Sequence, residues 1–109
     1  MPNTYKVLAQ ATLPATTASN IYTVPSATST VLSTITICNQ NSSQSSYRIA
    51  IRPSNEALTT KNYLAYDVPI QANDTTALTL GITLTATDTI NVYSTNASVS
   101  FGLYGSEVT

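Results

Sequence analysis

Apolar and polar residues alternate at every second position over most of this chain, and this period of two restricts the fold more than any other feature. Residues 78–84 are the clearest case, because leucine or isoleucine fills every even position. Alternation of this kind puts one set of side chains on each face of a β-strand. The 20 threonines add to the signal, since β-branched residues favour strands over helices. The sequence therefore predicts an all-β chain.

Polar turns and prolines divide the alternation into about eight short strands. Pro14, Pro25 and Pro53 each end a run, and proline is excluded from the middle of a sheet. Gly81 interrupts the cleanest run and predicts a bulge or bend. Residues 54–61 are the one stretch that could turn helically. We expect a single antiparallel β-sandwich domain over 1–109, of jelly-roll or immunoglobulin-like type.

The phase of the alternation predicts which side chains form the core. The residues expected to point inward are Val7, Ile35, Ile37, Ile49, Ile51, Leu78, Leu80, Ile82 and Val92. The two ends of the chain lack this pattern. We therefore expect short extended arms at 1–4 and 105–109, available to contact a neighbour.

The shortage of charge indicates what surrounds the domain. Charged residues make up 8% of the chain, against roughly 25% in typical soluble domains. With a net charge of −1, identical copies would repel one another little. Four lysines and arginines are too few to neutralise many phosphates, so we expect no nucleic-acid partner. No run approaches 18 apolar residues, and we expect no membrane partner.

The side chains that usually carry catalysis are missing or isolated. There is no histidine, and the five carboxylates stand singly along the chain without an evident partner. The one cysteine cannot form an internal disulfide, and no spacing suits a metal site. The three glycines cannot build a phosphate-binding loop. The sequence predicts no enzyme activity, no metal and no cofactor.

Tyrosine and arginine supply the candidate contact residues. Seven tyrosines with no tryptophan is a high number for this length, and Tyr63, Tyr66 and Tyr104 are candidates for an interface. The alternative is that tyrosines only finish the rim of the core. Arg48 and Arg52 share one strand face, where they either bind acidic groups of a neighbouring subunit or are simply solvated.

Four stretches carry a resemblance to a known group of proteins. They are MPNTYKVLAQ, YRIAIRPSNEAL, NYLAYDVPIQANDTTALTLGITLTATDTINVYS and SVSFGLYGSEV. With them the chain resembles small virion proteins of bacteriophages that infect cyanobacteria and other aquatic bacteria. The resemblance spans most of the chain and is most specific in DVPI, LTLGITL, TDTINVYS and FGLYGSEV.

The resemblance implies a structural place on the outside of a phage particle, for a protein made in the host cytoplasm. One interpretation is a decoration or cement protein that binds the major capsid protein or other virion proteins and stabilises the shell. The alternative is a small tail, neck or fibre module that binds a receptor or carbohydrate. A homo-oligomer is expected from the low charge, and a trimer by analogy with decoration proteins.

Overall fold

Strands dominate the part of the chain that the structure, a computed structural model, describes: residues 3–109, with the side chain of Leu80 excepted. The eight strands are β1 (Asn3–Thr12), β2 (Ser19–Thr23), β3 (Ser29–Asn39), β4 (Ser45–Arg52), β5 (Tyr63–Ile70), β6 (Thr75–Leu84), β7 (Thr89–Ser94) and β8 (Val99–Val108). Two short 3₁₀ turns, η1 (Pro53–Asn55) and η2 (Thr60–Asn62), lie between β4 and β5. Within this described part, no helix has the length and apolar character needed to cross a membrane.

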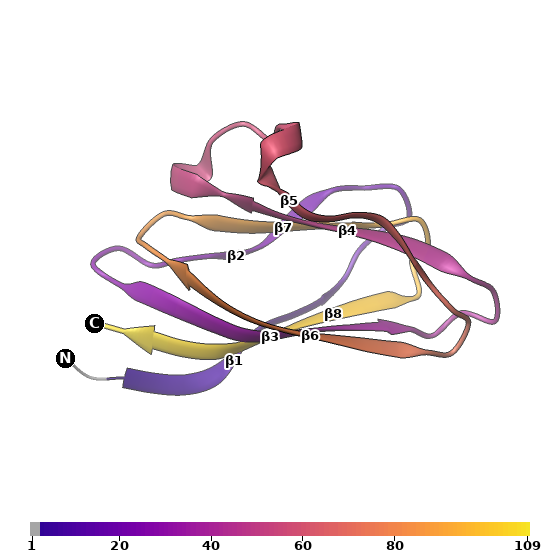
Figure 1. Cartoon of the computed structure of the whole chain (residues 1–109), viewed down its shortest axis with the longest axis horizontal. Helices are drawn as coiled ribbons and strands as arrows, with labels where there is room; N and C mark the ends of the chain where they lie inside the picture. The colour runs from indigo at the N-terminus through magenta and orange to yellow at the C-terminus, as the bar shows by residue number, and fades with distance from the viewer. Residues whose placement is uncertain (1–2) are drawn as a thin grey trace.

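The strands form two antiparallel sheets that pack face to face, as Figure 1 shows. One sheet has the order β1-β8-β3-β6 and the other has the order β2-β7-β4-β5. Every connection except that from β4 to β5 crosses from one sheet to the other. This order is that of an eight-stranded jelly roll. The predicted β-sandwich is confirmed, and of the two types that the sequence left open the chain adopts the jelly roll.

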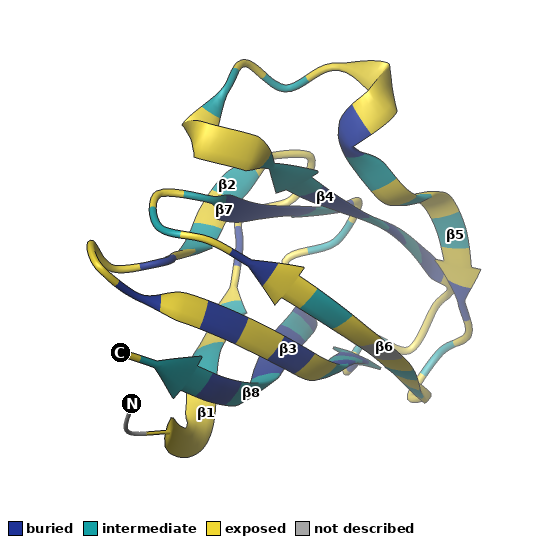
Figure 2. Cartoon of the chain, turned by 60° about the vertical axis from the view of Figure 1, so that its left-hand side comes forward, coloured by how far each residue is buried: buried dark blue, intermediate teal, exposed yellow. Residues whose placement is uncertain are grey.

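Both sheets contribute to one apolar core between them. Its fully buried side chains of largest volume are Phe101, Leu32, Ile35, Ile37, Ile49, Ile70, Leu84, Ile90 and Leu103. Figure 2 shows buried and exposed residues alternating along β3, as the period of two predicts. Of the residues predicted to point inward, Ile35, Ile37, Ile49 and Val92 are buried, while Ile51, Leu78 and Ile82 are partly buried against the core. The side chain of Leu80 lies outside the described residues.

A line of β-bulges crosses the first sheet at the level of Tyr104. Relative to β8, strand β1 carries an extra residue between Val7 and Ala9. On the other side of β8, strand β3 carries an extra residue between Leu32 and Thr34. An extra residue bends a strand and shifts which of its side chains face the core. The alternation therefore changes phase at the same level in two strands.

The bulge in β1 overturns the predicted position of Val7. Beyond this bulge the outward side chains of β1 are Tyr5 and Val7, and Val7 is 51% exposed. Ala9 and Ala11, on the other side of the bulge, pack against the core as a regular strand would place them. The single phase assumed for residues 5–11 is wrong, because the inserted residue reverses the two faces.

Two glycines make this bulged region sterically feasible. Gly81 of β6 has a φ of +67°, a left-handed conformation that glycine adopts readily, which confirms the predicted bulge or bend. Gly105 of β8 lies against the backbone of β3. A Cβ atom at Gly105 would overlap the carbonyl oxygen of Val31, so only glycine allows this approach.

The ends of the described chain are paired strands and not arms. Asn3 pairs with Val108, which also pairs with Ser29 of β3. The expectation of arms is therefore wrong for residues 3–4 and 105–108, because the outer ends of β1 and β8 continue the ladder. Residues 1–2 of the predicted arm lie outside the described residues. Figure 1 shows the start of β1 and the end of β8 at the same end of the sandwich.

A partly buried polar cluster joins the two sheets near these ends. Tyr22 of β2 donates a hydrogen bond to the Glu107 carboxylate of β8, and the hydroxyl of Thr30 lies 2.8 Å from the Tyr22 hydroxyl. The Lys6 ammonium lies 2.8 Å from the same carboxylate, whose side chain is 13% exposed. The hydrogen bonds that the Glu107 carboxylate accepts from Lys6 and Tyr22 lower the pKa of Glu107. Burial, followed by the bond to Glu107, raises the pKa of Tyr22 to about 12.

We expect Gly105→Ala to destabilise the fold by about 3 kcal/mol, because the new methyl group must displace the backbone of β3. Gly81→Ala is the matched control. Its Cβ atom would meet nothing within 4 Å, and only the positive φ opposes it, at about 1–2 kcal/mol. Urea unfolding of both variants measures the difference. Equal losses would show that the close approach at Gly105 does not matter.

We expect Glu107 to make the stability of the fold sensitive to acid. Since the folded state lowers the pKa of Glu107, its contribution is present above its unfolded pKa of about 4.3 and is lost as pH falls through the lower folded value. Between pH 5 and pH 3 the wild type should therefore lose more stability than Glu107→Gln. Thermal melts across this range test the point, and parallel curves would contradict it.

Candidate interaction surface

The outer face of the sheet β2-β7-β4-β5 collects four of the five residues predicted as contacts. In β4, Tyr47 and Ile49 point into the core while Arg48 and Arg52 point outward. Tyr63 and Tyr66 come from the neighbouring strand β5. Tyr104 is not among them, since it belongs to the other sheet. We call the outer face formed by Arg48, Arg52, Tyr63, Tyr66, Asp67 and Tyr93 the tyrosine–arginine face.

A bulge in β5 directs two side chains toward Arg48. In the pairing of β4 with β5, Tyr47 faces Val68, but the next paired residue of β5 is Ala65. Tyr66 and Asp67 therefore share the place opposite Arg48. Asp67 has a φ of +53°, a left-handed conformation that aspartate tolerates better than most residues. The result is that an aromatic ring and a carboxylate both reach the same guanidinium.

Arg48 is enclosed by three partners. Its guanidinium carbon lies 4.2 Å from the centroid of the Tyr66 ring and 4.3 Å from that of Tyr93. Nε donates to Asp67 Oδ1 at 2.6 Å, and Nη2 donates to Oδ2 at 3.3 Å. The hydrogen bond to Asp67 raises the pKa of Arg48. Arg48 thus links β4 to both of its neighbouring strands, and its charge is matched within the chain.

Tyr63 and Tyr66 form an aromatic pair beside Arg48. Their ring centroids are 4.9 Å apart with an interplanar angle of 83°, an edge-to-face arrangement that aromatic rings favour. Together with Thr60 they line a surface pocket of about 480 Å³. Tyr66 is 56% exposed, so this pair offers aromatic area to a partner.

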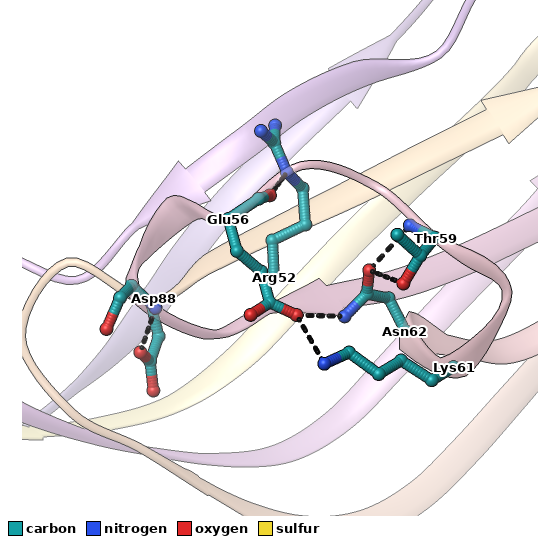
Figure 3. A network of polar contacts seen from close by, with 7 residues as sticks. Arg52, Glu56, Thr59, Lys61, Asn62 and Asp88 are labelled. Atoms are coloured by element: carbon teal, nitrogen blue, oxygen red, sulfur yellow. Dashed lines mark hydrogen bonds and ion pairs between the residues drawn. The ribbon is translucent and has the colours of Figure 1, made fainter.

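The connection from residue 53 to residue 62 stands above one end of this sheet, as Figures 1 and 2 both show. Figure 3 shows the polar contacts that hold it in place. Arg52 Nε donates to the carbonyl oxygen of Glu56 at 2.7 Å. The Glu56 carboxylate instead accepts from Asn62 Nδ2 at 3.1 Å and lies 3.4 Å from the Lys61 ammonium. The bonds to Asn62 and Lys61 lower the pKa of Glu56.

A second, more apolar surface lies on the outer face of the sheet β1-β8-β3-β6. Tyr104 folds back along this face and covers Gly102, where a Cβ atom would collide with its ring. Beyond the bulges, Tyr5 is 79% exposed, and Val7 and Val31 are exposed beside it. We call Tyr5, Val7, Val31 and Tyr104 the apolar face. It lies on the opposite side of the molecule from the tyrosine–arginine face.

Sequence reasoning missed Asp67 and Tyr93 as members of the tyrosine–arginine face. The signal for Tyr93 was present, because Ile90 and Val92 fix the inward phase of β7 and leave Tyr93 outward. No such signal exists for Asp67, because its bulge breaks the alternation of β5.

The acidic side chains decide whether these surfaces could hold a metal ion. Within residues 3–109, no three histidine, cysteine, aspartate or glutamate side chains gather where they could hold a metal ion. The carboxylates of Asp67, Glu56 and Glu107 each bind a cation of the chain itself.

No family model matches the sequence, and no curated protein matches it either. Among solved structures, a chain in the structure of infectious bursal disease virus Gx strain is similar, with a TM-score of 0.52 and 10% identity. The match covers 97% of this chain but 31% of that chain, so this protein spans about a third of its length. A pentameric capsid protein isolated from metagenomic phage sequences matches with a TM-score of 0.37 and 14% identity, over 95% of this chain and 63% of that chain. The first match shows a shared fold.

We expect Tyr66→Leu to destabilise the fold by about 1 kcal/mol, because it removes the ring that contacts both Tyr63 and Arg48. Tyr66→Phe keeps the ring and should leave the free energy of unfolding within about 0.5 kcal/mol of the wild type. Urea unfolding of both variants makes the comparison. If leucine and phenylalanine behave alike, the ring contacts do not contribute.

Proposed function

We propose that this protein is a non-enzymatic virion structural protein of a phage that decorates the outside of the capsid and stabilises it. The observation that carries the proposal is that both outer faces of the jelly roll expose aromatic and apolar side chains in a chain with very little charge. Exposed apolar patches mark interaction sites on protein surfaces. Tyrosine and arginine are also enriched in the buried centres of protein interfaces.

The physical properties of the surface suit a protein present in many copies. A net charge of −1 lets identical copies sit close together with little repulsion. A fold shared with a chain in a virus structure supports this role, as does the resemblance to small phage virion proteins. Neither the fold nor the resemblance implies a catalysed reaction. Binding to a capsid shell depends instead on the contact area and on shape complementarity.

The partners we propose are the major capsid protein or other virion proteins, together with further copies of this chain. The contact residues are Arg48, Arg52, Tyr63 and Tyr66 on one face and Tyr104 on the other. With two opposite faces available, one can bind the shell while the other meets a neighbouring subunit. A homo-oligomer, which we propose to be a trimer by analogy with decoration proteins, would use both faces.

A second candidate is a tail, neck or fibre module that binds a carbohydrate or receptor. It is favoured by the pocket that Thr60, Tyr63 and Tyr66 line. Tyrosine rings offer flat apolar area with a hydroxyl at the edge, which suits a ligand that is apolar on one face and polar at its rim.

Particles that lack this protein should assemble but lose resistance to heat and to low salt, because the contacts that it makes between shell subunits are absent. Infectivity after graded heating, compared with particles to which purified protein has been added back, measures this. Particles that keep full heat resistance but fail to adsorb to the host would instead support the tail module.

A further inference from the structure

Arg52 differs from the other basic residues of the described chain in having no acidic partner. Lys6, Arg48 and Lys61 each lie next to a carboxylate, at 2.8, 2.6 and 3.4 Å. Over residues 3–109, no carboxylate lies within ion-pair distance of the Arg52 guanidinium. The positive charge at Arg52 is therefore uncompensated, although the chain as a whole carries a net charge of −1.

The nearby carboxylates are held where they cannot neutralise Arg52. Figure 3 shows the Glu56 carboxylate directed away from the Arg52 guanidinium, toward Asn62 and Lys61. Asp88, in the same figure, accepts hydrogen bonds from the backbone amides of Ser54 and Thr85, both at 2.9 Å. Each carboxylate is thus committed to other donors. The lack of an ion pair at Arg52 follows from a fixed arrangement of the connection.

Three neutral oxygens hold the guanidinium in place. Nε donates to the carbonyl oxygen of Glu56 at 2.7 Å, and Nη1 donates to Asn20 Oδ1 at 2.8 Å. Nη2 donates to the carbonyl oxygen of Asn55 at 3.4 Å. A guanidinium has five N–H donors, so one N–H remains on each terminal nitrogen. Two remaining donors can serve the two oxygens of one carboxylate.

We propose that Arg52 binds an acidic side chain, aspartate or glutamate, of the virion protein on which this chain sits. The inference rests on the proposed function and adds the chemistry of the partner at one point of the contact. The single positive charge of Arg52, which already donates to three neutral oxygens, balances the single negative charge of one carboxylate. A phosphate would bring close to two negative charges and more acceptor oxygens against those already present.

The proposal separates two arginines that appear equivalent in the sequence. Arg48 already binds Asp67 and lies between two tyrosine rings, so its charge is used within the chain. Arg52 is pre-positioned but has no ionic partner, which makes it the anchor for a partner's acidic group. Because its side chain is already ordered, little rotamer freedom is lost on binding.

The test measures binding of purified protein to particles that lack it, at low and at moderate salt. We expect Arg52→Gln to weaken binding about ten-fold or more and to reduce its salt dependence, because it removes a charge-assisted contact. Lys61→Gln is the matched control. It removes one positive charge from the connection that follows Arg52, where the Lys61 side chain is 73% exposed, and it should leave affinity within about two-fold. Thermal melts of both variants confirm that they fold.

The outcomes distinguish this inference from the proposed function. If the wild type binds the particles and Arg52→Gln binds equally well, the proposed contact of Arg52 with an acidic side chain is wrong and the decoration role stands. If the wild type does not bind particles at all, both are overturned. Should Arg52→Gln fail to fold, Arg52→Lys decides. Weakened binding with the wild-type salt dependence supports the guanidinium–carboxylate contact, and unchanged affinity rejects it.

Discussion

The pairing of β8 with both β1 and β3 is the interaction on which the rest of the structure depends. It places the last strand between the first and the third, and it supplies Val99, Phe101 and Leu103 to the core. The contact is tight enough at Gly105 to exclude any side chain. Since β1 meets its sheet through β8, the order of the first sheet cannot be completed until β8 is in place. Such long-range pairing is intrinsically slow to form.

Much of the fold could be predicted from the sequence because the period of two is a local signal. It placed the strands, and it identified Ile35, Ile37, Ile49 and Val92 as core residues. It failed for Val7 because a bulge depends on the neighbouring strand, which the sequence alone does not reveal. In β3, which carries its own bulge at the same level, the adjacent apolar residues Val31 and Leu32 marked the break in phase. If Ile35 and Ile37 set one phase for all of β3, Val31 would point inward and Leu32 outward, which is the reverse of what the structure shows.

The candidate surface was harder to predict than the fold because its members depend on irregular pairing. Tyr63 and Tyr66 are three residues apart, a spacing that would put them on opposite faces of a regular strand. A register shift between Tyr63 and Ala65 adds a residue, and the two rings meet edge to face. The different roles that we assign to Arg48 and Arg52 arise in the same way. The bulge that brings Asp67 to Arg48 provides nothing for Arg52.

The direct pairing of Asn3 with Val108 has a consequence for how this domain can be combined with other polypeptides. Any segment attached before residue 3 and any segment attached after residue 108 must leave from the same corner of the sandwich. The tyrosine–arginine face lies on the other sheet and stays clear of fused cargo, whereas the apolar face begins at Tyr5, only two residues from this corner. A short linker between the two ends would also close the chain into a ring, so the domain can be circularly permuted by opening it at the polar turn around residues 40–44.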